Sequence, residues 1–374
     1  MIRRVLLALL LFATLASSAS AAPRLRLGFD DDRIKWMTKP DSFVALQREL
    51  GAPFTRITIP WHRGEVRPRP VVRTYLARAA AAGRVRQKVV LAVYGEAADA
   101  PTEPVAREQF CRFARNVMAH VPAMSAIVIW NEANTPRYWP VSAGARAYEA
   151  LLARCWDVLH AARPTVNVVD STASHYDPAG FIRALGAAYR ASGRGKPIVD
   201  TFGHNPYPDF AAEDPWAVHP AGGTIGEGDY DKLMGAISDA FASTAQRVPS
   251  DAWRRLWYLE DGFQTVVPPF FDWAFDGLYT GRENDRTVLP AFGLRRSQSS
   301  QLTAAISLAY CQPAVSAFFN FELIDETRLV GWQSGLLYAN GIRKPSFGAY
   351  REIAAAASSG SIDCSKVAGA PPQR

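Results

Sequence analysis

The sequence lacks several features that identify common classes of protein. It has four cysteines but no CxxC motif and no paired histidine spacing, so we expect no zinc site and no other metal. Lys and Arg are spread along the chain without forming a concentrated run, so nucleic-acid binding is not expected. No internal repeat of solenoid length is present, which excludes a repeat architecture.

No segment after the first residues is apolar enough to span a membrane. Arg3 and Arg4 precede an apolar stretch at 5–15, and small residues follow up to Ala21, which is the pattern of an export signal over residues 1–21. The stretch is about half the length of a membrane-spanning helix, so a permanent anchor is the weaker alternative. We expect a secreted protein, extracellular or periplasmic, with no membrane span after removal of the signal.

The mature chain would begin near Ala22 and have 353 residues, since 374 minus 21 leaves 353. Its formal charge would fall from +7 to +5, because Arg3 and Arg4 leave with the signal. This balance suits an anionic cell surface or an acidic glycan, but an ordinary solvated surface is the favoured interpretation. The length exceeds the roughly 250 residues of a typical (β/α)8 barrel, so one domain with long loops is sufficient. We expect a monomer.

Four cysteines in an exported chain indicate two disulfides, for which three pairings are possible. Cys111 and Cys155 lie on consecutive predicted helices, whereas Cys311 ends the seventh predicted helix and Cys364 follows the eighth. Because elements that follow one another tend to be neighbours in space, this placement favours the pairs Cys111–Cys155 and Cys311–Cys364.

Apolar runs rich in β-branched residues alternate with amphipathic stretches, which is typical of repeated βα units around a parallel sheet. The predicted strands are Leu25–Asp30, Phe54–Trp61, Lys88–Tyr94, Ser125–Asn131, Val166–Ser171, Val199–Asn205, Leu256–Glu260 and Val315–Phe321. The predicted helices are Asp41–Leu50, Pro70–Ala82, Val105–His120, Gly144–Ala162, Pro178–Ala191, Asp229–Gln246, Ser297–Tyr310 and Ser346–Ala356. Nearly all the strand runs are continuously apolar, as expected of strands covered on both faces.

Two folds fit eight such units, a closed barrel and an open doubly wound sheet. A dinucleotide-binding open sheet would carry a glycine-rich turn after its first strand, whereas this chain has Asp30, Asp31 and Asp32 there. The sequence therefore favours a single (β/α)8 TIM barrel over residues 22–365, followed by a flexible tail at 366–374.

Two glutamates stand out at the carboxyl ends of strands, which is where a barrel enzyme carries its reactive groups. Glu132 follows the apolar run 126–130, and Glu260 follows the run 256–259. These are the fourth and seventh strands, which face each other across the barrel mouth, so the fold can bring the two carboxyl groups together. Such a pair is what glycoside hydrolysis requires. For either glutamate alone, a structural salt bridge is the competing interpretation.

The two segments resemble the catalytic motifs of glycoside hydrolase clan A. The Asn-Glu-Pro motif that follows strand four in that clan is similar to WNEAN at 130–134, with Ala133 in place of proline. The Thr-Glu-aromatic-Gly motif that follows strand seven is loosely similar to LEDG at 259–262. The resemblance implies that Glu132 is the acid/base and Glu260 the nucleophile, with families 39 and 5 most alike and with no organic cofactor or obligatory metal.

The same resemblance implies roles for four other residues. Arg56 is similar to an arginine on strand two beside the nucleophile, and Asn131 to an asparagine that holds the sugar hydroxyl next to the reacting carbon. His204 and Tyr207, in GHNPYP at 203–208, are similar to side chains that hydrogen-bond the glutamates or the sugar. The competing interpretation is a satisfied core histidine and a packed tyrosine.

Sugar rings present apolar faces, so aromatic side chains above the barrel are candidates for substrate binding. The predicted aromatic contacts are Trp61, Tyr94, Trp139, Trp273, Phe321 and Trp332. Trp273 belongs to a long aromatic loop after the second glutamate, which we interpret as one wall of a cleft. Two acidic clusters, at 30–32 and 322–326, could contact sugar hydroxyls or a cation, but plain surface acidity is favoured.

The sequence thus predicts a retaining glycoside hydrolase that acts on an extracellular polysaccharide or oligosaccharide. A non-catalytic glycan-binding barrel is the alternative from another class, and an inverting hydrolase is a second alternative. Xylosides, β-glucans, mannans and bacterial exopolysaccharides all fit, and the sequence does not choose among them.

Overall fold

The computed structural model describes residues 25–37, 40–265, 286–289, 294–328 and 331–372. The predicted export signal and the predicted aromatic contact Trp273 lie outside these residues. Within them, no helix combines the length and the apolar character needed to cross a bilayer.

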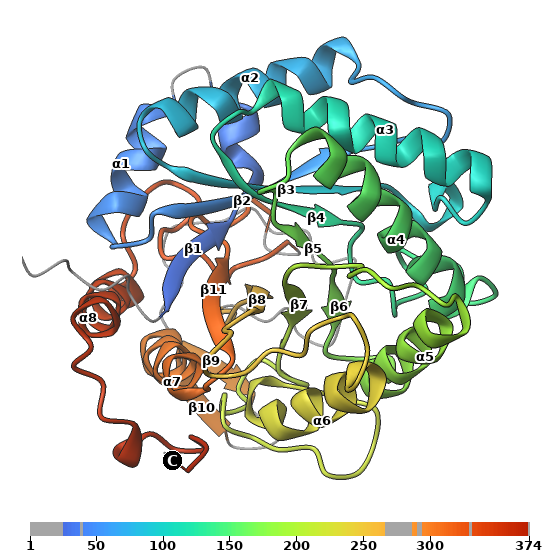
Figure 1. Cartoon of the computed structure of the whole chain (residues 1–374). Helices are drawn as coiled ribbons and strands as arrows, with labels where there is room; N and C mark the ends of the chain where they lie inside the picture. Colours follow the sequence, from blue (N-terminus) through green and yellow to red (C-terminus); the bar gives the residue numbers. More distant parts are fainter. Residues whose placement is uncertain (1–24, 38–39, 266–285, 290–293, 329–330, 373–374) are drawn as a thin grey trace, which may run out of the picture.

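Parallel strands form the centre of the molecule (Figure 1). They are β1 (Arg26–Asp30), β2 (Phe54–Pro60), β3 (Lys88–Tyr94), β4 (Met124–Ile129), β5 (Val168–Val169), β6 (Thr172–Ala173), β7 (Phe202–Asn205), β8 (Leu256–Asp261) and β11 (Val315–Phe321). β5 pairs with β4 and β6 pairs with β7, so these two short strands are halves of one. A parallel bridge between Val169 and Thr201 closes the ring. The described residues therefore form the predicted eight-stranded barrel.

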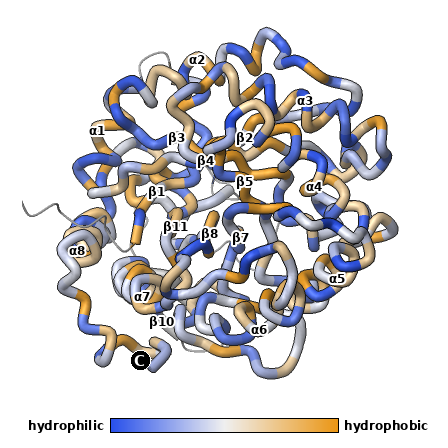
Figure 2. Tube along the Cα trace, in the orientation of Figure 1, coloured by the Kyte–Doolittle hydropathy of each residue, from blue (hydrophilic) through white to orange (hydrophobic). Residues whose placement is uncertain are grey.

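Helices surround the strands as an outer ring (Figure 1). They are α1 (Asp41–Glu49), α2 (Pro70–Arg84), α3 (Pro104–His120), α4 (Gly144–Ala162), α5 (Pro178–Ala191), α6 (Tyr230–Phe241), α7 (Gln298–Cys311) and α8 (Pro345–Ser359). An antiparallel hairpin of β9 (Arg286–Leu289) and β10 (Leu294–Ser297) leads into α7. In Figure 2 the stretch around β4 and β5 is orange, whereas the outer helices alternate between blue and orange.

Local sequence signals explain where several helices begin. Pro178 and Pro345 lie in the first turns of α5 and α8, where a missing N–H costs nothing and the fixed φ suits a helix. Ser297 caps α7, because its side chain accepts a hydrogen bond from the amide of Ser300. The predicted helix starts at Pro178 and after Ser297 are confirmed.

The core has two layers that follow the alternation of side chains along each strand. Val89, Leu91 and Val93 of β3 pack toward the helices, whereas Val90 and Ala92 belong to a separate cluster inside the barrel. That inner cluster also contains Phe54, Ala126, Val128, Val169, Trp257, Leu259, Ala317 and Phe319. Side chains therefore fill the interior of the barrel, so a substrate can bind only at the end of the barrel.

Strand five is shorter and more broken than the predicted run Val166–Ser171. Asp170 Oδ1 accepts a hydrogen bond from the amide of Gly203 at 2.7 Å, and Asp200 Oδ2 accepts one from the amide of Val168 at 2.8 Å. These side chains replace backbone acceptors of the ladder, so the sheet is interrupted where they bind. The predicted strand Val199–Asn205 likewise begins only at Phe202, because Gln246 Oε1 accepts the preceding amides of Ile198 and Val199.

Both predicted disulfides are present. Cys111–Cys155 joins α3 to α4, and Cys311–Cys364 joins the end of α7 to a short turn after α8. Beyond that turn, Val367 packs against the core together with Ala370, so the described part of the tail predicted at 366–374 is attached to the barrel. Two disulfides fit a protein that folds in an oxidising compartment.

Removing either disulfide is expected to lower the free energy of unfolding by about 4 kcal/mol, because the two bridges close loops of 44 and 53 residues in the unfolded chain. The variants Cys111→Ala/Cys155→Ala and Cys311→Ala/Cys364→Ala should therefore unfold at lower urea concentration by similar amounts. Urea denaturation under non-reducing conditions checks this, with the reduced wild-type chain as a reference. An unchanged midpoint in either double variant would contradict the expected effect.

Candidate active site

Polar side chains from opposite sides of the barrel meet at the carboxyl ends of its strands. Asp30 ends β1, Arg56 lies within β2, Glu132 follows β4, Asn205 ends β7 and Glu260 lies near the end of β8. Each follows or interrupts an apolar run, so the backbone that holds it is anchored in the core. Hydrogen bonds link Asp30 and Glu260 to Arg56, and a separate hydrogen bond links Asn205 to Glu132.

Arg56 is the centre of this network and is fully buried. Its Nη1 donates to Glu260 Oε1 at 2.7 Å and also to the carboxylate of Asp30. Its Nη2 donates to Asn131 Oδ1 at 2.9 Å. Because the guanidinium is planar and always charged, these contacts fix the positions of a carboxylate from β8 and an amide from the end of β4. The predicted neighbours of the two glutamates are thus brought together.

Glu132 lies in a turn whose backbone is unusual. The φ angles of Trp130 and Glu132 are +68° and +41°, values that non-glycine residues adopt at a cost and that are enriched at functional sites. Hydrogen bonds hold this turn: the amide of Glu132 donates to Ser171 Oγ at 3.2 Å, and the Trp130 indole donates to the Tyr138 carbonyl at 2.7 Å. The surroundings therefore determine where the Glu132 side chain projects.

The carboxyl group of Glu132 favours its protonated form. Burial, and after it the negative charge of Glu260, raises the pKa of Glu132 to about 7. A hydrogen bond from Asn205 Nδ2 to Glu132 Oε1, at 2.8 Å, opposes this shift without cancelling it. Near neutral pH a substantial fraction of Glu132 can therefore donate a proton.

Glu260 has different partners. Arg56 donates to its Oε1, and the Tyr207 hydroxyl donates to its Oε2 at 3.3 Å. Donors of this kind stabilise a carboxylate, and a guanidinium does so by charge as well as by hydrogen bonding. The hydrogen-bond donors of the two glutamates therefore differ: a guanidinium and a hydroxyl bind Glu260, whereas the neutral amide of Asn205 binds Glu132.

The expectation of plain surface acidity is wrong for three of the clustered acids. Asp30 is 4% exposed and contacts Arg56, so it is part of the buried network. Asp31 is also buried and accepts hydrogen bonds from the backbone amides at 33, 323 and 324. Asp325 is 1% exposed and pairs with Lys344 Nζ at 2.8 Å. Asp31 thus fastens the end of β1 to the segment that follows β11.

His204 is a core histidine whose hydrogen bonds are satisfied, which was the competing interpretation of this residue. Its Nε2 donates to the carbonyl of Ile225 and its Nδ1 accepts from Thr172 Oγ1, both at 2.9 Å. Burial lowers the pKa of His204 to about 4, so the ring is neutral at physiological pH. The hydrogen bonds of this side chain do not reach either glutamate. The neighbouring Asn205, which the sequence interpretation did not assign, makes the contact with Glu132 instead.

The predicted aromatic contacts divide into two groups. Phe321 and Trp332 are partly exposed and pack with Tyr207, with ring centroids 6.4 and 5.4 Å from that of the tyrosine. Tyr94 is also partly exposed and packs edge-on against Tyr138 at 5.5 Å. These rings lie beside the glutamates, since Tyr207 contacts Glu260 directly.

Trp61 and Trp139 belong to the second group, and for them the prediction of substrate contact is wrong. They are 0% and 2% exposed and both pack edge-on against Trp130 in the core. A side chain enclosed in this way has no face left for a sugar. Their proximity to the strand ends in the sequence did not reveal which way the rings point.

No model of a known protein family and no curated protein sequence matches this chain. Solved structures match its fold. GH5_18 from Streptomyces cattleya in complex with GlcNAc aligns with a TM-score of 0.58 at 15% identity, over 90% of this chain and 81% of that chain. A variant of that protein in complex with Manb1-4GlcNAc gives a TM-score of 0.59 at 14% identity, over 89% and 80% of the two chains. The shared fold is the (β/α)8 barrel.

A more distant likeness has the same barrel within a longer protein. A calcium binding mutant of Bacteroides uniformis beta-glucuronidase 2 aligns with a TM-score of 0.51 at 14% identity, over 88% of this chain. This chain spans only 34% of the length of that one. At such identities the likenesses show the fold, and the chemistry has to be argued from the residues of the site.

Replacing Arg56 is expected to be costly for stability. The variant Arg56→Ala leaves Asp30 and Glu260 buried without their cation, which typically destabilises a protein by about 3–5 kcal/mol. The free energy of unfolding from urea denaturation measures this. Arg48→Ala removes an exposed arginine of α1 and serves as the control, with an expected change of within about 0.5 kcal/mol. Equal effects of the two substitutions would contradict a central place for Arg56.

Proposed function

We propose that this protein is a retaining glycoside hydrolase in which Glu132 is the acid/base and Glu260 is the nucleophile. One observation carries the proposal: Arg56 binds Glu260, whereas the pKa of Glu132 is raised to about 7. Glycosidases need one carboxyl group that holds a proton and one that does not, at the same pocket. The cation bound to Glu260 and the raised pKa of Glu132 support this assignment of roles.

In the first step of the proposed reaction, Glu132 gives its proton to the oxygen of the scissile glycosidic bond. The carboxylate of Glu260 attacks the sugar carbon as the bond to the protonated oxygen breaks, and the leaving alcohol departs. The sugar is then held as an ester of Glu260. In the second step Glu132, now a carboxylate, takes a proton from water, and the resulting oxygen nucleophile displaces Glu260. The free sugar leaves with its original configuration, and both side chains return to their starting forms.

The surrounding residues have supporting roles in this proposal. Asn131 Oδ1 accepts from Arg56, so the amide nitrogen of Asn131 is available to donate to a sugar hydroxyl. The Tyr207 hydroxyl steadies Glu260, and the Asn205 amide steadies Glu132. Phe321 and Trp332 offer ring faces on which an apolar sugar face can pack.

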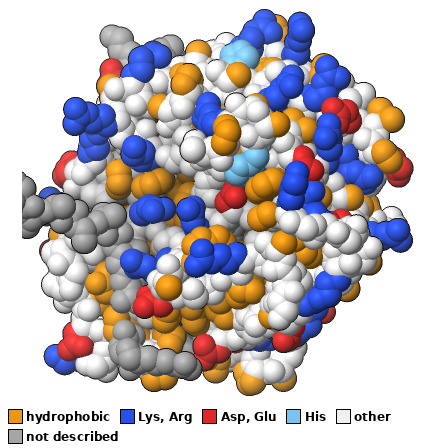
Figure 3. All heavy atoms as spheres, viewed as in Figure 1, with side chains coloured by type: hydrophobic (Ala, Val, Ile, Leu, Met, Phe, Trp, Pro, Cys, Tyr) orange, Lys and Arg blue, Asp and Glu red, His pale blue; other side chains and the backbone are white. Residues whose placement is uncertain are grey.

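The proposed substrate is an extracellular polysaccharide or oligosaccharide that the exported protein meets outside the cytoplasm. The similar structures include complexes with GlcNAc and Manb1-4GlcNAc and a beta-glucuronidase, so both neutral and acidic sugars belong in a first survey. Lys and Arg side chains are spread widely over the face shown in Figure 3, which fits an ordinary solvated surface. Charge therefore does not select an acidic substrate.

A screen of aryl glycosides and polysaccharides with the exported form tests the proposal. Hydrolysis of at least one substrate is expected, and NMR of the earliest product should show the same anomer as the substrate. The opposite anomer first would favour an inverting enzyme, in which the carboxyl groups stand about 6.5–9.5 Å apart. Binding of glycans without any hydrolysis would favour the non-catalytic glycan-binding barrel.

A further inference from the structure

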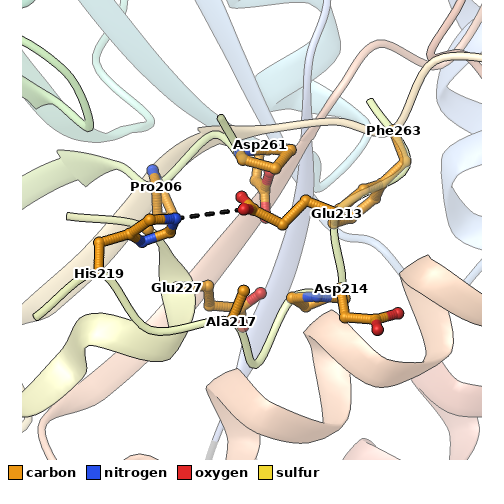
Figure 4. A pocket seen from close by; sticks show the side chains of 11 residues that line it. Pro206, Glu213, Asp214, Ala217, His219, Glu227, Asp261 and Phe263 are labelled. Atoms are coloured by element: carbon orange, nitrogen blue, oxygen red, sulfur yellow. Dashed lines mark hydrogen bonds and ion pairs between the residues drawn. The ribbon is translucent and has the colours of Figure 1, made fainter. Parts of the chain in front are cut away.

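A second group of acidic and histidine side chains lies beside the candidate active site, around a small cavity of about 10 Å³ (Figure 4). Glu213, His219 and Glu227 line it from the segment between β7 and α6, and Asp261 lines it from the end of β8. Its volume is about that of the space needed by one water molecule or one ion. Asp261 directly follows Glu260, so the cavity adjoins the proposed nucleophile.

His219 and Glu213, which line this cavity, form a group of three ligand-type side chains with the exposed Asp209. His219 Nε2 lies 3.2 Å from Glu213 Oε1 and 3.5 Å from Asp209 Oδ2, and the three atoms all lie within 4.8 Å of one another. Figure 4 shows His219 and Glu213 facing each other, joined by a dashed line. A tetrahedral metal with bonds of about 2.0–2.2 Å separates its ligand atoms by roughly 3.3–3.6 Å. The two measured separations match this spacing closely.

Each of the three side chains is oriented by a hydrogen bond on its other atom. His219 Nδ1 donates to Asp229 Oδ2 at 2.7 Å, and Nε2 donates to Glu213 Oε1 at 3.2 Å, so Nε2 is the ring atom at which a metal would replace a proton. Glu213 Oε2 accepts from the amide of Asp209 at 2.7 Å, and Asp209 Oδ1 accepts from Thr224 Oγ1 at 3.0 Å. A carboxylate that fixes a histidine from behind is the usual outer partner of a metal-binding histidine.

An independent observation comes from the buried side of the cavity. Glu227 is 3% exposed, and neither of its carboxylate oxygens has a hydrogen-bond partner. The backbone amide of Ala309, in α7, is the donor that approaches this carboxylate. Asp261 is fully buried and its Oδ2 is also without a partner. Buried carboxylates in globular proteins are normally paired with a cation or a metal.

The described side chains around the cavity supply little compensating charge. Asp214 is neutralised by Arg296 at 2.7 Å. Lys232 is close by, but its Nζ donates to the backbone carbonyls of His219, Gly222 and Thr224 rather than to a carboxylate. Among the described residues, His175 pairs with Asp209, and His219 pairs with Asp209, Glu213 and Asp229. Two histidines therefore face five acids, which are Asp209, Glu213, Glu227, Asp229 and Asp261.

We propose that this cavity binds one divalent metal cation, with His219, Glu213 and Asp209 as ligands and with Glu227 and Asp261 on its buried side. One imidazole with carboxylates suits Zn²⁺ or Mn²⁺, whereas Ca²⁺ prefers oxygen ligands alone. The ion would fasten the segment that carries Tyr207 to the end of β8 that carries Glu260. It would hold the site in shape and take no part in the proposed hydrolysis. Sequence spacing did not indicate it, because the ligands form no paired-histidine motif.

The test uses the purified full chain and each metal alone. After stripping with a chelator and dialysis against Zn²⁺, Mn²⁺ or Ca²⁺, elemental analysis should find one metal per chain for Zn²⁺ or Mn²⁺. The melting temperature should rise by about 4 °C when the metal is present at about 100 times its Kd. Neither readout depends on catalytic activity, so the test of the metal site does not depend on whether the protein is a hydrolase.

Variants locate the ion. His219→Gln and Glu213→Gln should each abolish stoichiometric binding, and Asp229→Asn should weaken it by about 10–100-fold. Asp209→Asn changes an exposed side chain, so it should fold normally and still bind more weakly. His160→Gln is the matched control, because His160 pairs with Asp200 at 2.9 Å in a distant part of the barrel. It should retain the metal.

Two outcomes overturn the proposal. A chain that takes up none of the three metals, with an unchanged melting temperature, would mean that protons alone neutralise the buried acids. Stoichiometric binding that survives in His219→Gln, Glu213→Gln and Asp209→Asn alike would place the ion elsewhere. A chain that takes up only Ca²⁺, with the same loss in the three variants, would keep the site and overturn the choice of metal.

Discussion

The variant Glu260→Ala should lose about 10⁴-fold or more of the hydrolytic rate on any substrate that the wild-type protein cleaves. Without the carboxylate, no group is positioned to attack the sugar carbon, and the ester intermediate cannot form. Steady-state kinetics on the best substrate from the screen measures the loss in kcat. Glu260 lies at the barrel mouth, where its carboxylate contacts Arg56 and Tyr207. Removing this side chain should therefore affect catalysis more than the packing of the core.

A matched control distinguishes this effect from the general loss of a charge. Glu96→Ala removes an exposed glutamate after β3, from the same end of the barrel strands, and should leave the rate unchanged. Azide added to Glu260→Ala should occupy the vacated space and attack an activated aryl glycoside, giving a glycosyl azide of inverted configuration. If Glu260→Ala and Glu96→Ala had equal rates, Glu260 would not be the nucleophile.

The variant Glu132→Gln should lose about 10²–10⁴-fold of the rate on substrates with a poor leaving group, because glutamine cannot supply a proton. Aryl glycosides with an acidic phenol should suffer much less in the first step, since their leaving group departs without protonation. Comparing the two kinds of substrate in wild type and variant measures this difference. A uniform loss on both would contradict a role for Glu132 as the acid.

The pH profile of the wild-type protein should carry the signature of the same group. The pKa of Glu132 is raised to about 7, and the first step requires its protonated form. Activity should therefore fall as pH rises through about 7, and this basic limb should vanish in Glu132→Gln. A basic limb of the same position in the variant would mean that another group titrates there.

The barrel could be predicted from the sequence because its signal is repeated. Eight apolar runs alternate with amphipathic stretches, and each repeat adds to the same conclusion. The two glutamates could be found for a related reason, since each interrupts a run where a barrel strand ends. The disulfide pairs followed from the order of the helices, which places Cys111 near Cys155 and Cys311 near Cys364.

The predictions that failed concern the direction in which a side chain points. His204 and Asn205 are adjacent, and a strand turns successive side chains to opposite faces. Asn205 binds Glu132, whereas His204 binds the carbonyl of Ile225 in the interior. In the same way, Trp61 and Trp139 lie close in sequence to strand ends, yet their rings are enclosed in the core. Composition and sequence spacing do not show which way such a side chain points.

Buried charge was the other feature that the sequence concealed. Asp30 was expected at the surface because acidic residues usually lie there. Its burial becomes intelligible only when Arg56, 26 positions later and on the next strand, is seen to contact it. The cluster of Asp209, Glu213 and His219 was overlooked for the same reason, because its significance depends on the buried Glu227 and Asp261 beside it.

Covalent trapping measures the central claim most directly. The wild-type protein is incubated with a 2-deoxy-2-fluoro glycoside that has a good leaving group and the sugar found in the screen, and its peptides are analysed by mass spectrometry. We predict one sugar per chain, attached to the peptide that contains Glu260. Glu132→Gln should be labelled at close to the wild-type rate, because a good leaving group departs without protonation. A sugar attached to a different side chain, or rapid turnover to the opposite anomer with no labelled peptide, would contradict the account.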